Sequence, residues 1–205
     1  MALIKLNNRG VRNVSTFGSV TGGSMTFIKK VTASSDDTIS FVDGTSDVVL
    51  DDTYKEYLFT FKDIHPETNN VQFSFQGSTD GGSSYGVTIT STFFRAYNYE
   101  GGTDAALEYD TSEDLAQSTS FQILSSQCGN DNDQSCSGYL HLFNPSSTTF
   151  VKHFIAKINN YHQGDYSMNF FPAGYFNSTS AIDAIQFKMS SDAIDAGDIC
   201  LYGIL

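Results

Sequence analysis

Hydrophobic and polar residues alternate along most of this chain. In two segments between residues 54 and 78, a large apolar side chain recurs at every second position: Tyr57, Phe59 and Phe61, then Val71, Phe73 and Phe75. A period of two is typical of β-strands that bury one face. The intervening HPETNN contains the proline and asparagines of a turn, so the pattern predicts that the two strands pair as an antiparallel hairpin.

Similar β-branched and aromatic runs predict strands along the rest of the sequence. These runs are TISFV, DVVLD, VTITSTFFRAY, TSFQILS, GYLHLFN, FVKHFIAKINNY, MNFFPAGYF, AIQFKMS and DICLYGI. Short strands separated by polar turns are typical of a β-sandwich or a β-barrel. We therefore expect one all-β domain over residues 31–205, preceded by an N-terminal arm over residues 1–30.

The last predicted strand stays apolar up to Leu205. Leu201 on one face and Tyr202 on the other indicate that both faces are apolar, which predicts a central strand covered on both sides. Gly203 within this strand predicts a bulge or a close backbone approach.

Residues 98–117, NYEGGTDAALEYDTSEDLAQ, interrupt the alternation. They are acidic and contain few β-branched residues, which predicts a long surface loop. Thr111 and Asp114 have the spacing of a capping box, which predicts one helical turn within it.

The chain is strongly acidic, with 23 Asp and Glu against 11 Lys and Arg and a formal net charge of −12. Such a surface repels a phosphate backbone, so nucleic-acid binding is disfavoured. No apolar run approaches the ~18 residues of a membrane span, and none resembles the core of a signal peptide. We therefore expect a soluble, unexported chain without membrane insertion.

Basic residues concentrate at the start of the chain. Lys5, Arg9 and Arg12 lie within the first 13 residues, where no acid occurs. A basic arm on an acidic body can dock on an acidic partner, so we interpret these three residues as a candidate assembly contact.

Motifs for nucleotide binding, serine hydrolysis, zinc proteolysis and EF-hand calcium binding are absent from the sequence. His141 and His153 would supply two zinc ligands if their strands paired in one register, but no third ligand is evident, which favours ordinary hydrogen-bonded histidines. Residues 130–133, NDND, offer oxygen ligands but lack a carboxylate at calcium-loop spacing, which favours a solvated turn. We expect neither a metal nor a cofactor.

The three cysteines form no CxxC pair. Cys128 and Cys136 either bridge across their short loop or remain free, and free thiols are favoured in a reducing cytosol.

Carboxylates for glycoside hydrolysis could come from the acidic segment, which contains Glu100, Glu108, Glu113 and Asp114. That mechanism requires two carboxyl groups held at a fixed separation in a cleft, and a loop is poorly suited to this. Catalysis is therefore disfavoured, and we assign no catalytic residue.

Several tyrosines lie in or beside the predicted loops, where they are candidate contacts for a glycan or a protein partner: Tyr97, Tyr99, Tyr109, Tyr161 and Tyr166. Aromatic rings stack on sugar rings, and loops often carry function. The alternative is that these tyrosines cap the ends of the sandwich.

Three segments resemble a family of virion structural proteins from tailed phages of marine bacteria and cyanobacteria: MALIKLNNRGVRNVSTFGS, YKEYLFTFKDIHPETNNVQFSFQGSTDGG and AIDAIQFKMSSDAIDAGDICLYGIL. The likeness runs the length of the chain and includes LHLFNPSSTTFVKHF. The resemblance implies a jelly-roll or lectin-like antiparallel β-sandwich, displayed on the particle as a tail fibre or capsid decoration and typically a homotrimer. It carries over no catalytic residue.

The resulting expectation is a non-enzymatic virion protein, made in the host cytoplasm, that contacts itself and other virion proteins. A glycan on the host surface is a further candidate partner. Two alternatives stay open: a glycan depolymerase of a phage tail, which would need a carboxylate pair in a cleft, and a free carbohydrate-binding module, which would need neither an arm nor an oligomer.

Overall fold

Twelve antiparallel β-strands make up the fold of residues 24–205, the part of the chain that this computed structural model describes. The larger sheet runs in the order β1 (Met25–Thr32), β12 (Ile194–Ile204), β3 (Glu56–Pro66), β8 (Cys136–Phe143), β9 (Lys152–His162), β10 (Tyr166–Phe176), β5 (Ile89–Tyr99) and β6 (Ala105–Tyr109). The smaller runs β7 (Gln122–Cys128), β4 (Val71–Ser78), β11 (Ala184–Met189) and β2 (Ile39–Val42).

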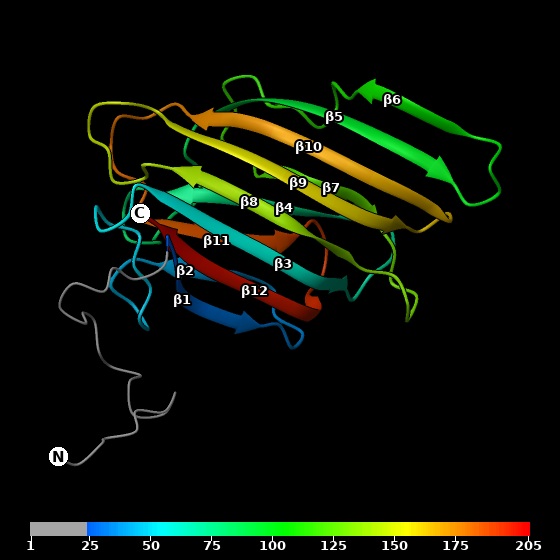
Figure 1. The fold of residues 1–205 in the computed structure, drawn as a ribbon, viewed down its shortest axis with the longest axis horizontal. Helices are drawn as coiled ribbons and strands as arrows, with labels where there is room; N and C mark the ends of the chain where they lie inside the picture. The colour runs from blue at the N-terminus through cyan, green and yellow to red at the C-terminus, as the bar shows by residue number, and fades with distance from the viewer. Residues whose placement is uncertain (1–23) are drawn as a thin grey trace, which may run out of the picture.

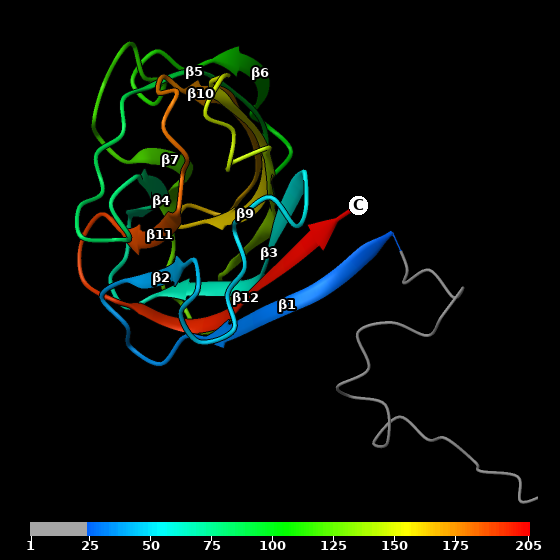
Figure 2. The same ribbon diagram turned by 90° about the vertical axis from the view of Figure 1, so that its left-hand side faces the viewer.

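The larger sheet curves around the smaller one (Figures 1 and 2). The two are joined by a single residue pair, Cys128 of β7 opposite His162 of β9. An all-β, antiparallel sandwich is therefore confirmed. No helix long and apolar enough to cross a membrane occurs between residues 24 and 205.

Phenylalanine side chains fill the space between the sheets. Phe187 of β11 lies at the centre, with its ring centroid 5.2–6.4 Å from those of five others: Phe41, Phe59, Phe61, Phe73 and Phe75. All six rings are buried, and most of the pairs meet edge to face, the arrangement that aromatic quadrupoles favour. The sandwich is thus closed by an aromatic contact between its layers.

The predicted hairpin between residues 55 and 77 is wrong, although its buried face is right. β3 pairs with β12 and β8, whereas β4 pairs with β11 and β7, so the two strands belong to opposite sheets. Phe61 and Phe73 meet across the core, with ring centroids 5.2 Å apart. Two strands with one apolar face each bury more surface face to face than side by side, and the HPETNN turn crosses from one layer to the other.

The acidic segment 98–117 contains more regular structure than the sequence predicts. Residues 105–109 form β6, which pairs with β5, and residues 111–113 form a turn rather than a helix. Conversely, DVVLD forms no strand, yet Val48 and Leu50 are buried in the core. Local composition therefore missed the strand at residues 105–109 and predicted a strand at DVVLD where none forms.

The last strand, β12, is paired on both sides, with β1 and β3. A Cβ at Gly203 would lie 2.3 Å from the Tyr54 ring, so the predicted close approach is confirmed and involves an aromatic side chain. The expectation that both faces are covered is wrong, because Tyr202 faces outward and is only half-buried against Phe27.

Residues 25–30, which the sequence grouped with the arm, belong to β1. Lys5, Arg9 and Arg12 lie outside the described residues. The assembly contact assigned to them stays a prediction.

We expect Phe187→Ala to lower the free energy of unfolding by about 3–5 kcal/mol, because it removes the ring that five others contact and leaves a cavity. Urea denaturation measures this change. Phe150→Ala is the matched control, since Phe150 is 69% exposed and should cost little. Equal midpoints for the two variants would contradict the central role of Phe187.

Candidate functional site

A pocket of about 230 Å³ opens at the corner where the two sheets meet, beside the Cys128–His162 pair. Strands of both sheets and the β5–β6 loop contribute its lining: Arg95, Tyr97, Asp104, Gln127, His162, Tyr166 and Met168. Behind it lies a small hydrophobic cluster of Phe93, Met168 and Phe170, separate from the main core. The pocket therefore has its own packed support.

Tyrosines from two neighbouring strands form one side of this pocket. The antiparallel register of β5 and β10 places Tyr99 opposite Tyr166 and Tyr97 opposite Met168. The Tyr166 ring lies 4.9 Å from that of Tyr99 and 5.8 Å from that of Tyr97, centroid to centroid. Because the period of two brings residues 97 and 99 to the same face of β5, the three rings form one aromatic wall.

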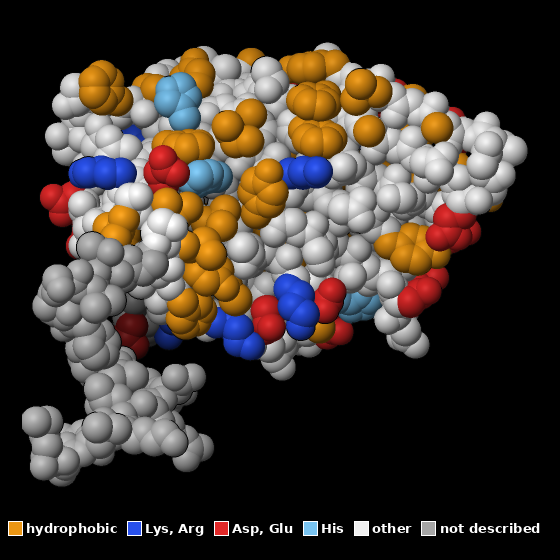
Figure 3. Space-filling model, viewed as in Figure 1, with side chains coloured by type: hydrophobic (Ala, Val, Ile, Leu, Met, Phe, Trp, Pro, Cys, Tyr) orange, Lys and Arg blue, Asp and Glu red, His pale blue; other side chains and the backbone are white. Residues whose placement is uncertain are grey.

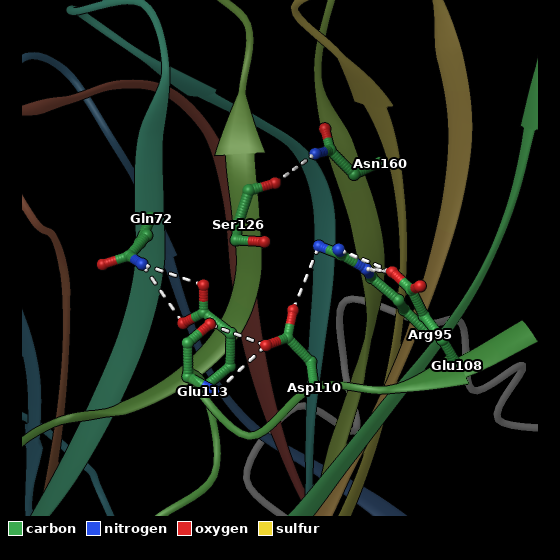
Figure 4. A network of polar contacts seen from close by, with 8 residues as sticks. Gln72, Arg95, Glu108, Asp110, Glu113, Ser126 and Asn160 are labelled. Atoms are coloured by element: carbon green, nitrogen blue, oxygen red, sulfur yellow. Dashed lines mark hydrogen bonds and ion pairs between the residues drawn. The ribbon is translucent and has the colours of Figure 1, made fainter.

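Arg95 is paired with two carboxylates, as Figure 4 shows. Its Nη2 lies 2.6 Å from Glu108 Oε1 and its Nε donates to the same oxygen at 2.8 Å, while Nη1 lies 3.1 Å from Asp110 Oδ2. The register of β5 and β6 sets Arg95 directly opposite Glu108. The guanidinium lies 5.9 Å from the centroid of the Tyr97 ring, so it connects this ion cluster with the aromatic wall.

Glu113 continues the polar network towards the smaller sheet. Its carboxylate accepts hydrogen bonds from Gln72 Nε2 at 3.1 and 3.2 Å (Figure 4). Burial, with some repulsion from Asp110, raises the pKa of Glu113 above its usual value. Nearby, Asn160 donates to the Ser126 carbonyl at 3.0 Å, whereas Ser126 Oγ and Asn160 Oδ1 are buried and have no partner within residues 24–205.

His162 has a defined tautomer in its neutral state. Its Nδ1 accepts a hydrogen bond from the Gly164 amide at 2.8 Å, so the ring proton lies on Nε2. Burial and the nearby Arg95 charge lower the pKa of His162, against a smaller opposing effect of Asp165. The neutral ring therefore presents an N–H donor on its free nitrogen.

Tyr166 and Asp104 form a hydrogen-bonded pair in the pocket. The Tyr166 hydroxyl donates to Asp104 Oδ2 at 3.1 Å, and this hydrogen bond raises the pKa of Tyr166. Gln127 completes the lining with a backbone φ of 53°, in the left-handed region that non-glycine residues seldom adopt. Such strain is common at functional sites.

The structure brings some of the candidate tyrosines together and separates others. Tyr97 and Tyr166 line the pocket, and Tyr99 packs against Tyr166. Tyr109 instead lies on the outward face of β6, with its hydroxyl donating to Asp114 at 2.5 Å, and Tyr161 lies on the outward face of β9. The last two are therefore not part of this site.

The candidate carboxylates are also divided. Glu108 is bound by Arg95 and Glu113 by Gln72, while Asp114 accepts from Tyr109. Among residues 24–205, no three His, Cys, Asp or Glu side chains converge as metal ligands.

His141 and His153 lie on a real hairpin, since β8 pairs with β9, but the register sets His141 opposite Ile155. The two rings have separate partners: His141 Nε2 lies 2.9 Å from Glu56 Oε2, and His153 packs against Tyr175 with ring centroids 5.8 Å apart.

The cysteines of the described chain are free thiols. Cys128 and Cys136 are both buried, and Cys128 Sγ lies 3.4 Å from Ser125 Oγ. A hydrogen bond with Cys128 and burial raise the pKa of Cys136 well above its usual value, so this thiol stays protonated.

Sequence reasoning missed most of the polar residues of the pocket, namely Arg95, Asp104, Gln127 and His162. One signal was present: Arg95 occupies the same face of its strand as Phe93 and Tyr97, and a charge on a buried face requires a partner. Its partners Glu108 and Asp110 lie in the segment that the sequence predicted as a loop.

Comparisons with known proteins yield no relatives. No protein-family model matches the chain. No curated protein matches it, and no solved structure does.

We expect the neutral state of His162 to make stability depend on pH. Because its pKa is lowered on folding, the unfolded chain binds a proton more readily, so the contribution of His162 is present above pH 6.5 and is lost as the pH falls from 6.5 towards the folded-state pKa. In His162→Asn the amide oxygen can still accept from Gly164 but does not titrate, so the melting temperature should fall less over this interval. The control is Phe150→Ala at an exposed position, which removes no titrating group and should retain the wild-type profile. Identical profiles for wild type and His162→Asn would contradict the assignment.

Proposed function

We propose that this protein is a non-enzymatic component of a virion whose β-sandwich binds carbohydrate in the corner pocket. The observation that carries the binding role is the convergence of Tyr97 and Tyr166 on a pocket whose remaining lining, apart from Met168, consists of hydrogen-bonding groups. Aromatic faces bind the apolar faces of sugar rings, and amide, hydroxyl and carboxylate groups bind their hydroxyls. At about 230 Å³ the pocket is smaller than the roughly 300–1,000 Å³ of drug-sized sites, which suits one sugar unit of a longer chain.

Binding without hydrolysis is favoured by how the carboxylates are used. A glycosidase needs one carboxyl group as a proton donor and a second as a nucleophile or base. Here a single guanidinium binds both Glu108 and Asp110, so both carboxylates are held by Arg95. Among the described residues, the pocket lining contains one carboxylate, Asp104, whereas a glycosidase needs a pair. A depolymerase is therefore the less favoured alternative.

The virion placement is supported by the sequence resemblance alone. Such a placement predicts that the protein is found in purified particles, at a position reached by a host glycan. Mass spectrometry of purified particles tests this. Absence from particles, combined with sugar binding by the isolated protein, would favour the alternative of a free carbohydrate-binding module.

We expect Tyr97→Ala to weaken oligosaccharide binding by about 1–3 kcal/mol, the range of one aromatic contact plus the surface it buries. Isothermal titration with neutral and amino-sugar oligosaccharides measures this change. Tyr139→Ala is the control, because Tyr139 is a 40% exposed tyrosine on the outward face of β8. An equal loss of affinity in both variants, or an affinity that is unchanged in both, would contradict the pocket as the binding site.

A second observation favours self-association, which the resemblance implies as a homotrimer. The outward faces of five adjacent strands, β8, β9, β10, β5 and β6, contain no Asp or Glu. Hydrophobic side chains gather there in Figure 3. Phe94 and Phe171 stack with ring centroids 4.8 Å apart, and Leu107 is 72% exposed. We call this surface the acid-free face.

We propose that a second copy of this chain covers the acid-free face. Chains with a net charge of −12 repel one another, and contact is least opposed where acids are missing. The β6 edge also differs from the edge at the other end of the larger sheet. β1, at the opposite edge of the larger sheet, has Lys29, Lys30 and a register shift, whereas β6 has the unbroken AALEY.

Leu107→Asp places a charge on the acid-free face and should dissociate the oligomer. Light scattering should give a wild-type mass near three times 22.4 kDa and a monomer for the variant. Phe150→Asp is the matched control, since Phe150 is 69% exposed on a loop, and it should keep the wild-type mass. A monomeric wild type, or a variant of unchanged mass, would overturn this proposal. Loss of the oligomer on deleting residues 2–23 would do so as well, because it would assign association to the arm.

A further inference from the structure

We propose that the corner pocket selects neutral or amino sugars and rejects acidic ones. This inference rests on the proposed carbohydrate-binding function and specifies its ligand class. It follows from the balance of charge in the pocket and from which hydrogen-bonding groups remain free.

The pocket and its ion cluster have an excess of negative charge. One positive charge, on Arg95, stands against the carboxylates of Glu108, Asp110 and Asp104, and His162 is neutral. The net charge is therefore −2 at neutral pH. A carboxylate or sulfate on a sugar would be repelled, and desolvation would strengthen this repulsion, because charges interact more strongly in a partly buried site than in water.

Arg95 is the group that would otherwise bind an anion, and three of its five N–H donors already contact protein carboxylates. Nε and Nη2 point to Glu108 and Nη1 to Asp110, so the Nε–Nη2 edge is occupied and the charge of the guanidinium is already balanced by two carboxylates. Only the face of the guanidinium and the remaining N–H groups are left. Arg95 therefore positions the Tyr97 ring and the two carboxylates instead of neutralising a ligand.

The free groups match uncharged hydroxyls and ammonium groups. His162 Nε2–H is a donor, because the Gly164 amide already occupies Nδ1. The Gln127 amide both donates and accepts, and Asp104 accepts from Tyr166 through Oδ2, which leaves Oδ1 for a ligand. An amino sugar could pair its ammonium with Asp104 while its ring stacks on a tyrosine.

Three oligosaccharides of equal length test this selectivity by isothermal titration: a neutral gluco-oligosaccharide, a glucosamine oligosaccharide and an oligogalacturonate. We expect the first two to bind and the third to bind at least about tenfold more weakly. Glucosamine binding should weaken as salt is added, since it includes an ion pair, whereas binding of the neutral sugar should change little.

Asp104→Asn provides the sharpest variant, because an amide oxygen can still accept from Tyr166 while one negative charge is removed. It should lower affinity for the glucosamine oligosaccharide and raise affinity for the oligogalacturonate. Asp133→Asn removes an equal charge from an exposed loop and should change neither. Melting curves check that both variants fold.

The outcomes separate this inference from the function on which it rests. Preference for the oligogalacturonate, or an Asp104→Asn variant that behaves like Asp133→Asn, would overturn the selectivity while binding at the pocket stands. Failure of all three sugars to bind the wild-type protein would overturn both. If the first two sugars bind Tyr97→Ala as well as they bind the wild-type protein, the site lies elsewhere. This result would overturn both the selectivity and the pocket as the binding site.

Discussion

The contact between phenylalanines of the two sheets is the interaction on which the rest of the structure depends. Phe187 of the smaller sheet meets Phe59 and Phe61 of the larger one with ring centroids 5.3 and 5.2 Å apart. Each buried Phe contributes roughly 1.5–3 kcal/mol through removal of its surface from water. Without this contact each sheet would expose one complete apolar face, and the corner between the sheets would not exist.

The candidate site is a consequence of how the layers meet. Within residues 24–205 the strands of the two sheets pair only at Cys128–His162, and the pocket opens beside this pair. The small cluster of Phe93, Met168 and Phe170 supports the tyrosine wall from behind. Apart from Asp104 on the β5–β6 loop, the polar groups of the pocket lie on strands, which gives a binding site more precise geometry than loops would.

Periodicity predicted the elements and their buried faces but not their partners. The set from Tyr57 to Phe75 is buried as predicted, yet β3 and β4 face each other because a turn signal does not distinguish a hairpin from a crossing between layers. β6 was missed because AALEY has weak strand propensity and forms by pairing with β5. Of the site, the tyrosines were accessible from sequence. Arg95, Asp104 and His162 were not, since they come together only through pairings between distant segments.

The order of strands in the larger sheet also bears on how the chain reaches its native state. β12, at residues 194–204, lies between β1 at residues 25–32 and β3 at residues 56–66. The first strand thus has no native partner until nearly the whole domain has been synthesised, and its apolar residues stay available to wrong contacts in the meantime. Pairings this distant along the chain are slow to form. Completion of the larger sheet should accordingly be a late and slow step of folding, and the yield of native protein should be most sensitive to temperature and crowding before that step.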